Sequence, residues 1–382
     1  PGFTAPKILW VAKNEPEVFR RVAKVLLPKD YLRYQLSGEF FTDVSDASGM
    51  SLLDVAKRRW SDEMLKACRV PRAWLAEVTE SPVASAKVSA RAAKLTGLRA
   101  GTPIIAGAGD QAAGAVGCGV VRTGVVSCTL GTSGVVFAQT DKYRPDPQGR
   151  LHAFCHAVPG KWHLMGVQLS SAGSLQWYKN ALGGEEARRE KAGEGNAYDL
   201  LTAEAAKVPA GCEGLIFLPY LSGERTPHPD PNARGVFFGL TLRHGKAHLT
   251  RAVLEGVTYG LRDSLELMRA LGLRPTEVVA SGGGARSAFW RQMLADNFEA
   301  PIVTVSSTEG SAYGAALLAG VGAGVWPSVE AAGTAAVAET SRANPGADAE
   351  VYWDFYPRFR ALYPKLKGEF AAVAEVVGRR HG

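Results

Sequence analysis

A single carboxylate lies in a glycine-rich stretch of the first half of the chain. Asp110 follows an apolar run, 103–105, that predicts a buried strand, and precedes small residues, 111–117, that predict a helix. It is the only acidic residue between Glu80 and Asp141. Because open α/β sheets place their chemistry where a strand ends and a helix begins, we interpret Asp110 as a general base that takes a proton from a substrate hydroxyl. In the same interpretation, Gln111 hydrogen-bonds other hydroxyls of that substrate.

Two other interpretations of this stretch are open from the residues alone. An aspartate after glycine is often only a helix cap. Gly107, Gly109 and Ala112 also fit the dinucleotide fingerprint, which would indicate a nicotinamide oxidoreductase. That fingerprint requires an acid about 20 residues further on for the ribose, and residues 112–140 contain none.

Three further glycine turns could bind phosphate through main-chain N–H groups. They are 131–134, 172–174 and 282–284, each beside an expected strand end or helix start. Any one alone could be an ordinary turn, but three together favour an anion site. The chain has no G-x-x-x-x-G-K-[ST] loop, which excludes the P-loop kinases. Residues 287–290, with Phe289 and Trp290, offer an aromatic surface for a purine beside the third turn.

The composition is that of an ordinary globular protein. The 382 residues suggest two large domains, with 46% hydrophobic and 21% charged residues. The net charge of +7 comes from scattered lysines and arginines, so we expect no nucleic-acid partner. The five cysteines form no C-x-x-C pair and favour a reducing, cytoplasmic location. No apolar segment is long enough for a membrane span, so we expect no membrane partner.

The remaining candidates for chemistry are weaker. His152 and His156 lie four residues apart in a segment that looks extended, so a metal pair is not favoured. Trp10, Trp60 and Trp177 are interpreted as core or interface aromatics.

The elements that must position these residues alternate along the chain. The spacing predicts helices at 16–36 with a break at Pro28, 85–95, 171–182, 249–271, 287–299, 311–319, 328–338 and 352–377. It predicts a hairpin at 123–137, strands at 162–167, 215–218, 277–280 and 302–305, a charged surface segment at 183–195 and a proline-rich loop at 223–231. This order indicates a parallel or mixed sheet covered by helices, with a domain boundary near 121–123.

Several long patterns resemble the FGGY carbohydrate kinases. Residues 2–10 are similar to the first signature of that family, and 235–240 with 248–255 to its second across the full spacing. The segments 27–32, 109–111, 223–227 and 282–284 resemble the branch of the family that phosphorylates D-xylulose. The resemblance covers essentially the whole chain.

The resemblance implies a two-domain α/β fold of the actin, hexokinase and ribonuclease-H type. Residues 1–122 would belong to the N-terminal, sugar-binding domain and 123–382 to the C-terminal, nucleotide-binding domain. ATP with Mg²⁺ would phosphorylate D-xylulose to D-xylulose 5-phosphate, with Asp110 as the base and Asp110 and Gln111 binding the sugar. The implied nucleotide residues are Gly131, Thr132 and Ser133 at the terminal phosphates, Gly173 near the nucleotide, and Gly283 and Gly284 flanking the adenosine. The Mg²⁺ ligands stay unassigned, and a homodimer stays open.

Two departures from the family pattern keep alternatives open. The family chain begins with a strand and an Asp-x-Gly-Thr phosphate turn before its first signature, and nothing here corresponds to them. We therefore expect an incomplete first domain, and weigh a catalytically impaired nucleotide-binding protein as the second hypothesis. Gln111 stands where some relatives have Asn, which leaves another sugar or polyol open as the substrate. An oxidoreductase is a distant third hypothesis.

Overall fold

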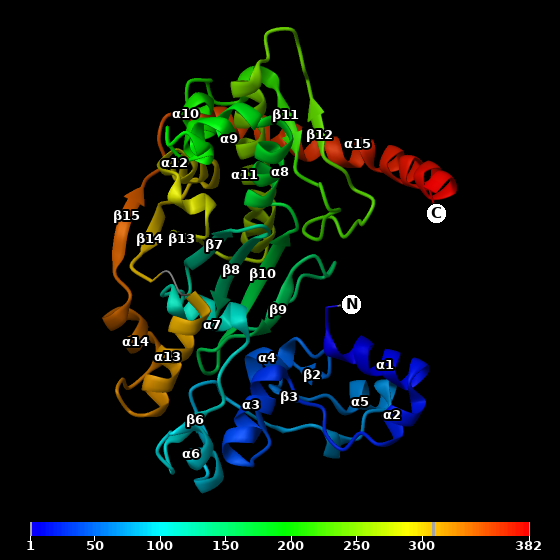
Figure 1. Ribbon diagram of the computed structural model, residues 1–382, viewed down its shortest axis with the longest axis vertical. Helices are drawn as coiled ribbons and strands as arrows, with labels where there is room; N and C mark the ends of the chain where they lie inside the picture. The colour runs from blue at the N-terminus through cyan, green and yellow to red at the C-terminus, as the bar shows by residue number, and fades with distance from the viewer. Residues whose placement is uncertain (1, 308–309, 382) are drawn as a thin grey trace.

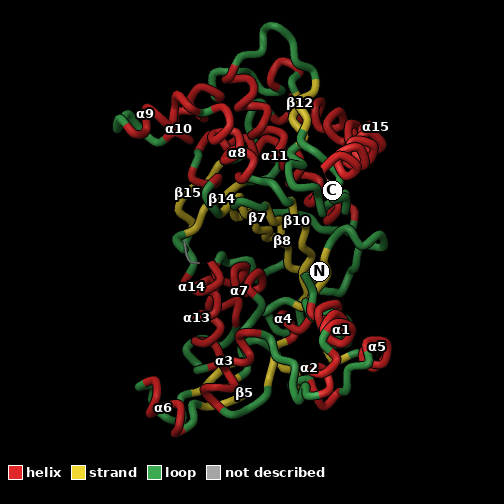
Figure 2. Tube along the Cα trace, turned by 45° about the vertical axis from the view of Figure 1, so that its right-hand side comes forward, coloured by secondary structure: helices red, strands yellow, loops and turns green. Residues whose placement is uncertain are grey.

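The computed structural model describes residues 2–307 and 310–381, which form two bodies. The first body, blue to cyan in Figure 1, contains the N-terminal helices and short strand pairs. The second, teal to red, is built on one large sheet. Figure 2 shows the strands of that sheet enclosed by helices, whereas the first body consists mostly of helices and loops.

The sheet of the second body has seven strands in the order β15-β14-β13-β7-β8-β10-β9. Strands β7, β13 and β14 run parallel, and the other neighbours pair antiparallel. The bounds are β7 (Val125–Leu130), β8 (Gly134–Thr140), β9 (His152–Cys155), β10 (Trp162–Gln168), β13 (Glu277–Ser281), β14 (Ile302–Val305) and β15 (Glu339–Ala343). A separate pair, β11 (Ile216–Leu218) and β12 (Val236–Phe238), lies outside the sheet.

Helices cover both faces of the sheet because its strands alternate between two apolar cores. Val126, Cys128 and Leu130 of β7 pack into the core with α11 (Lys246–Ala270), while Val125 packs into the core on the other face. On the α11 side lie α8 (Ala172–Leu182), α9 (Gly184–Lys191), α10 (Ala197–Ala205), α12 (Ala288–Phe298) and α15 (Ala349–His381). On the other side lie α7 (Asp110–Gly117), α13 (Gly310–Gly322) and α14 (Val329–Ala336). The sheet is therefore a middle layer, as the sequence predicts.

The first body has its own, smaller core. Its helices are α1 (Thr4–Asn14), α2 (Pro16–Arg20), α3 (Pro28–Ser37), α4 (Val44–Ser48), α5 (Asp62–Cys68) and α6 (Ala90–Thr96). Its strands form the pairs β1 (Phe41–Asp43) with β4 (Glu77–Thr79), β2 (Leu53–Asp54) with β3 (Arg59–Trp60), and β5 (Ala84–Lys87) with β6 (Pro103–Ile105). Ser61 caps α5 by accepting the N–H of Met64 at 3.2 Å.

The two bodies meet along the β9–β10 edge of the large sheet. Cys155 is buried in the core of the first body, and its N–H donates to Ser48 Oγ at 3.1 Å. The indole N–H of Trp162 donates to the carbonyl of Val55 at 2.9 Å, and Arg58 lies over the Trp162 ring. These contacts combine buried apolar surface with hydrogen bonds, so this edge holds the first body against the second.

Most predicted elements are confirmed, and the errors are local. The predicted strand at 103–105 exists as β6, but it is not buried as predicted, because it pairs only with β5 and Pro103 is exposed. The predicted helix 85–95 is wrong in its first part, because 84–87 pair as strand β5 with β6 and the helix starts only at Ala90. The predicted surface segment 183–195 contains helix α9. The predicted helix 16–36 is two helices with non-helical residues at 22–27, and strand β15 was not predicted. In each case tertiary pairing or packing outweighs local residue preference.

Candidate functional site

Asp110 is the first residue of α7, and the residue at the N-cap is Gly109. Asp110 therefore does not occupy the N-cap position, although its carboxylate accepts one of the free N–H groups at the start of the helix. Its side chain is exposed and accepts the N–H of Gln111 at 2.8 Å. Gln111 is also exposed. Both side chains are thus exposed at the helix N-terminus, where a ligand can reach them.

Helix α7 is fixed by close packing against α13. A Cβ on Gly117 would lie 2.0 Å from the carbonyl oxygen of Gly310, so only glycine allows the two backbones to approach this closely. The hydroxyl of Ser311 donates to the main-chain carbonyl of Asp110 at 2.8 Å. The backbone that carries the carboxylate is therefore tied to a second helix.

The three glycine turns line one cavity of about 730 Å³ in the second body. Of the predicted nucleotide residues, five line it: Gly131, Thr132, Gly173, Gly283 and Gly284. Residues far apart in the sequence thus come together as the phosphate interpretation requires. The cavity is also lined by polar residues that the sequence analysis did not identify, namely Gln176, Asn196, Tyr198, Asp199, Thr202 and Arg286. They come from helices and loops with no motif of their own.

The first two turns are joined through Thr132. Its carbonyl accepts the N–H of Ser171 at 3.0 Å and that of Gly173 at 3.2 Å. A Cβ on Gly173 would lie 2.7 Å from the same carbonyl oxygen, so the contact requires glycine. A Cβ on Gly283, in contrast, would meet no protein atom within 4 Å. Gly283 therefore faces open space at the cavity wall, where a ligand could approach the backbone.

Ser133 and the aromatic residues differ from the prediction. Ser133 is not among the cavity-lining residues, and its hydroxyl donates to the carbonyl of Leu169 at 3.2 Å. Phe289 packs against the guanidinium of Arg251 and does not line the cavity. Trp290 does line it, but the ring is buried and its N–H donates to Thr258 Oγ1 at 3.0 Å. The expected aromatic surface for a purine is therefore wrong, because Trp290 is only 1% exposed and Phe289 lies away from the cavity.

Asp110 and the cavity belong to the same edge of the large sheet. The parallel strands β7, β13 and β14 have their carboxyl ends at one edge, and the glycine turns follow β7 and β13 there. Strand β14 ends at Val305 and α13 begins at Gly310, so α13 also starts from this edge. The first turn of α13 contacts Asp110 through Ser311. The proton acceptor and the phosphate turns are therefore placed at the edge where open α/β folds bind ligands.

A charged cluster of the first body supports the turn before Asp110. The Nζ of Lys29 lies 2.6 Å from Asp30 Oδ1, 2.9 Å from Asp43 Oδ1 and 3.7 Å from Asp46 Oδ2. Asp43 also caps α4 by accepting the N–H groups of Ser45 and Asp46. Burial raises the pKa of Asp46 to about 6, although Lys29 acts in the opposite direction. This cluster was not identified from the sequence, because its acids show no spacing that would place them near Asp110.

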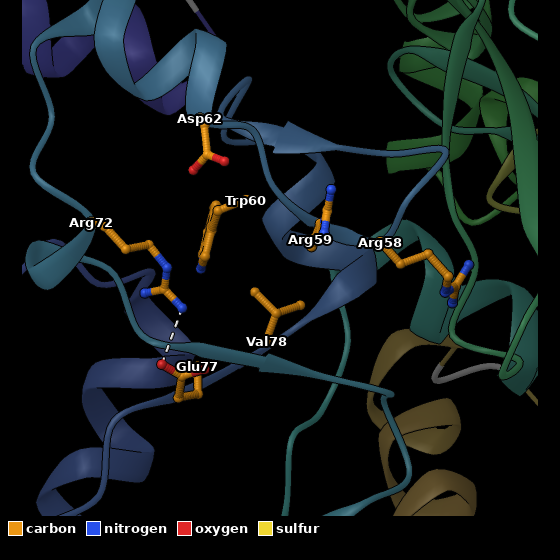
Figure 3. Close-up of a pocket in the computed structure, with 7 residues that line it drawn as sticks. All are labelled: Arg58, Arg59, Trp60, Asp62, Arg72, Glu77 and Val78. Atoms are coloured by element: carbon orange, nitrogen blue, oxygen red, sulfur yellow. Dashed lines mark hydrogen bonds and ion pairs between the residues drawn. The ribbon is translucent and has the colours of Figure 1, made fainter.

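A second hollow, of about 350 Å³, lies in the first body near β3 and β4. Figure 3 shows Arg72 paired with Glu77, while Arg58 points away from Trp60 and Val78. Arg58 is itself paired with Glu80 at 2.7 Å. Two of the three arginines that line the hollow, Arg58 and Arg72, are thus paired with acids, and we assign no function to this hollow.

The histidines and cysteines supply no metal cluster in the described part of the chain. No group of three or more His, Cys, Asp or Glu side chains suited to a metal ion occurs in residues 2–307 and 310–381. His152 lies on strand β9, as the extended prediction requires, and burial lowers its pKa to about 4. All five cysteines are buried free thiols. Among the described helices, none has both the length and the hydrophobicity that a membrane span needs.

Comparison with known proteins identifies both bodies. The N-terminal domain of the FGGY family of carbohydrate kinases matches residues 1–117, and the C-terminal domain of that family matches residues 126–323. The match to the N-terminal domain does not support the expectation of an incomplete first domain.

Individual relatives agree with the two domain matches. The xylulose kinase of Escherichia coli K12 is 45% identical over 370 residues, which are 96% of this chain and 73% of the relative. The gluconokinase of Bacillus subtilis is 32% identical over 97% of this chain and 72% of its own length. Among solved structures, the xyloylose kinase of Brucella ovis is 39% identical with a TM-score of 0.89, over 96% of this chain and 74% of that one.

A second solved structure, the xylulose kinase of Rhodospirillum rubrum, has the same TM-score of 0.89 at 32% identity, over 97% of this chain and 73% of that one. The agreement in sequence and in fold extends across both bodies. The chain belongs to the FGGY family of carbohydrate kinases, and it is a carbohydrate kinase similar to xylulose kinases.

Proposed function

We propose that the chain transfers the γ-phosphoryl group of ATP to the terminal hydroxyl of D-xylulose and forms D-xylulose 5-phosphate. The observation that carries this proposal is the placement of Asp110, an exposed carboxylate at the start of α7, on the same sheet edge as the glycine-lined cavity. The similarity to xylulose kinases supports the choice of sugar.

The chemistry divides between the two parts of the site. The carboxylate of Asp110 accepts the proton of the sugar hydroxyl as its oxygen forms a bond to the γ-phosphorus, and the bond from that phosphorus to the β-phosphate oxygen breaks to release ADP. Gln111 hydrogen-bonds a neighbouring hydroxyl. Main-chain N–H groups of the turns at Thr132 and Gly283 hold the phosphates, as backbone amides at helix starts and turns commonly do. Gly173 shapes the cavity wall beside them, since its own N–H donates to the carbonyl of Thr132.

Magnesium enters this account with the nucleotide. Mg²⁺ in phosphate-transfer enzymes commonly binds through substrate phosphates and few protein carboxylates. When bound, Mg²⁺ neutralises charge on the phosphates. We assign no side chain of this chain as its ligand.

Closure of the two bodies would exclude water from the phosphates and thereby limit ATP hydrolysis. The β9–β10 edge, where Trp162 and Cys155 contact the first body, would act as the pivot.

The test is a coupled assay of ADP release over D-xylulose, D-ribulose, gluconate, glycerol and no acceptor. We expect D-xylulose to give a kcat/KM at least roughly 10-fold above the other acceptors, because each mispaired hydroxyl costs binding energy in a polar site. A better rate with gluconate or a polyol would contradict the choice of sugar and leave the family assignment intact. ATP binding without acceptor-stimulated ADP release would favour the nucleotide-binding hypothesis.

A further inference from the structure

Lys29, near the start of α3, lies beneath the turn that carries Asp110. Its side chain is 24% exposed, and its three acidic neighbours differ in exposure: Asp43 is fully buried, Asp30 is 2% exposed and Asp46 is 29% exposed. Two buried carboxylates, Asp30 and Asp43, would strongly destabilise the fold without a nearby cation. Lys29 supplies that positive charge.

Lys29 also contacts the turn directly. Its Nζ donates to the carbonyl of Ala106 at 3.4 Å. A Cβ on Gly107, which has a φ of +82°, would lie 3.6 Å from Lys29 Cδ, so the aliphatic part of the lysine packs under this glycine. The side chain therefore supports the beginning of the turn with both its stem and its ammonium group.

Asp46 supports the end of the same turn. A Cβ on Gly109 would lie 3.4 Å from Asp46 Cα and 3.5 Å from Asp46 Oδ1. The N–H of Gly109 donates to Ser45 Oγ at 3.0 Å, and this hydroxyl is in turn bonded to Asp43. Gly109 is the residue immediately before Asp110, so the charged cluster and the proton acceptor are separated by one peptide unit.

The charges around Asp46 make its position depend on Lys29. The charged groups that face it are Lys29 and Asp30 from α3, Asp43 from β1 and Asp110 from α7. Arg33 is nearby, but its guanidinium donates to the carbonyls of Ile105 and Phe41. Burial lowers the pKa of Lys29, and the three carboxylates more than offset this, so the ammonium stays charged. It is the cation that holds Asp46 beside two other carboxylates.

We propose that Lys29 is a positioning residue for Asp110: it fixes the 106–109 turn directly and, by holding Asp46 against Gly109, sets where the Asp110 carboxylate stands. This inference rests on the proposed function, because it assigns Lys29 a role in the step that Asp110 performs. Displacement of a reacting group by about 1 Å can cost roughly 100-fold in rate. Contacts to Gly109, the residue before Asp110, are therefore close enough to affect turnover.

The test compares Lys29→Met and Lys29→Arg with Lys24→Met in the purified full chain. Lys24 is a matched control, since it lies in the same body and also donates to a main-chain carbonyl, that of Ala73, at 2.6 Å. For Lys29→Met we expect kcat to fall roughly 10- to 100-fold while KM for ATP changes less than about 2-fold. We expect the acid limb of kcat/KM to move to higher pH, because ionising a carboxylate of the cluster becomes more costly without the ammonium. Lys29→Arg should restore part of the rate.

A double-mutant cycle with Asp110→Asn separates this inference from the proposed function. If Lys29 acts through Asp110, Lys29→Met lowers kcat little further in the Asp110→Asn background. If the effects of the two substitutions on kcat add fully, the proposed role of Lys29 is wrong. The same holds if Lys29→Met leaves kcat and its pH profile unchanged, and neither result would contradict Asp110 as the base. Wild-type rates in Asp110→Asn would instead overturn the proposed base.

A second variant covers the case in which Lys29→Met does not fold. Asp46→Asn removes the charge of only the most exposed partner of Lys29. We expect kcat to fall, but by less than in Lys29→Met, and the melting temperature to stay within a few degrees of wild type. An unchanged kcat in Asp46→Asn would contradict the proposed route through Gly109.

Discussion

Gly314 of α13 lies directly against the main-chain carbonyl of Ala113 in α7. A Cβ at Gly314 would be 1.7 Å from that oxygen, and the reciprocal contact, Gly117 against Gly310, is nearly as close. Helix α7 is thus held by backbone-to-backbone packing, and Asp110 stands at its first turn. The position of the proposed base is therefore determined by a contact in the core of the second body, and not only by the residues around it.

The first prediction concerns this helix contact. Gly314→Ala forces α7 and α13 apart, so we expect the free energy of unfolding to fall by about 3 kcal/mol, as overpacking usually does. We expect kcat to fall as well, because α7 carries Asp110. Chemical denaturation and steady-state assays measure the two effects. Gly368→Ala is the control, since a Cβ there meets nothing within 4 Å and the residue lies in helix α15. Equal stability of the two variants would contradict the contact.

The second prediction separates a ligand contact from a folding contact. A Cβ on Gly283 meets no protein atom within 4 Å, so Gly283→Ala should leave the melting temperature unchanged. Because Gly283 lines the cavity, we expect the added methyl to obstruct the nucleotide and raise KM for ATP roughly 10-fold, with KM for the sugar unchanged. Gly184→Ala, at the start of α9 and also without a neighbour within 4 Å, is the control. If both variants bind ATP like wild type, Gly283 is not at the nucleotide.

The third prediction concerns Glu224 in the proline-rich loop. This side chain is buried and accepts the N–H groups of Leu169 at 2.9 Å and Arg225 at 2.7 Å, and burial raises its pKa to about 8. A folded-state pKa above the unfolded value gives stability that is complete below about pH 4.5 and is lost as pH rises through about 8.

Glu224→Gln keeps an oxygen for both N–H groups and cannot ionise. We therefore expect the free energy of unfolding of the wild type to fall relative to this variant between about pH 4.5 and pH 8. Each unit of pKa shift corresponds to about 1.4 kcal/mol. Urea denaturation across this range measures the difference, and Glu204→Gln, an exposed acid paired with Lys207, controls for loss of a charge. If the free energies of unfolding of wild type and Glu224→Gln change with pH in parallel, the pKa of Glu224 is not raised in the folded state.

The sequence predicts the sheet and the glycine turns because their signals are local. The valines around 131–134 specify a hairpin, and the alternation near Glu277 and Ile302 specifies two strands of a parallel sheet. Strand β5 was missed because its residues, Ala84–Lys87, favour helix, and only pairing with β6 makes them extended. Strand β15 has no apolar alternation, since it is an edge strand with an exposed face.

The candidate site likewise contains residues with local sequence signals and residues that only the fold brings together. Asp110 and the turns at Thr132, Gly173 and Gly283 carry recognisable motifs, and the structure brings the three turns to one cavity. Tyr198 and Asn196 reach that cavity from a segment with no signal of its own. Lys29 could not be placed from the sequence, because 77 residues separate it from Ala106, the carbonyl it contacts. Such long-range contacts depend on the packing of whole elements, which residue patterns do not encode.

The most direct measurement is the rate of phosphoryl transfer to D-xylulose in Asp110→Asn compared with Asp62→Asn. Both aspartates are exposed first residues of a helix, so both substitutions remove the same favourable interaction with the helix dipole. If Asp110 is the general base, Asp110→Asn lowers kcat roughly 100- to 10,000-fold without changing ATP affinity, and Asp62→Asn keeps the wild-type rate. A kcat for Asp110→Asn equal to that of Asp62→Asn would contradict the account.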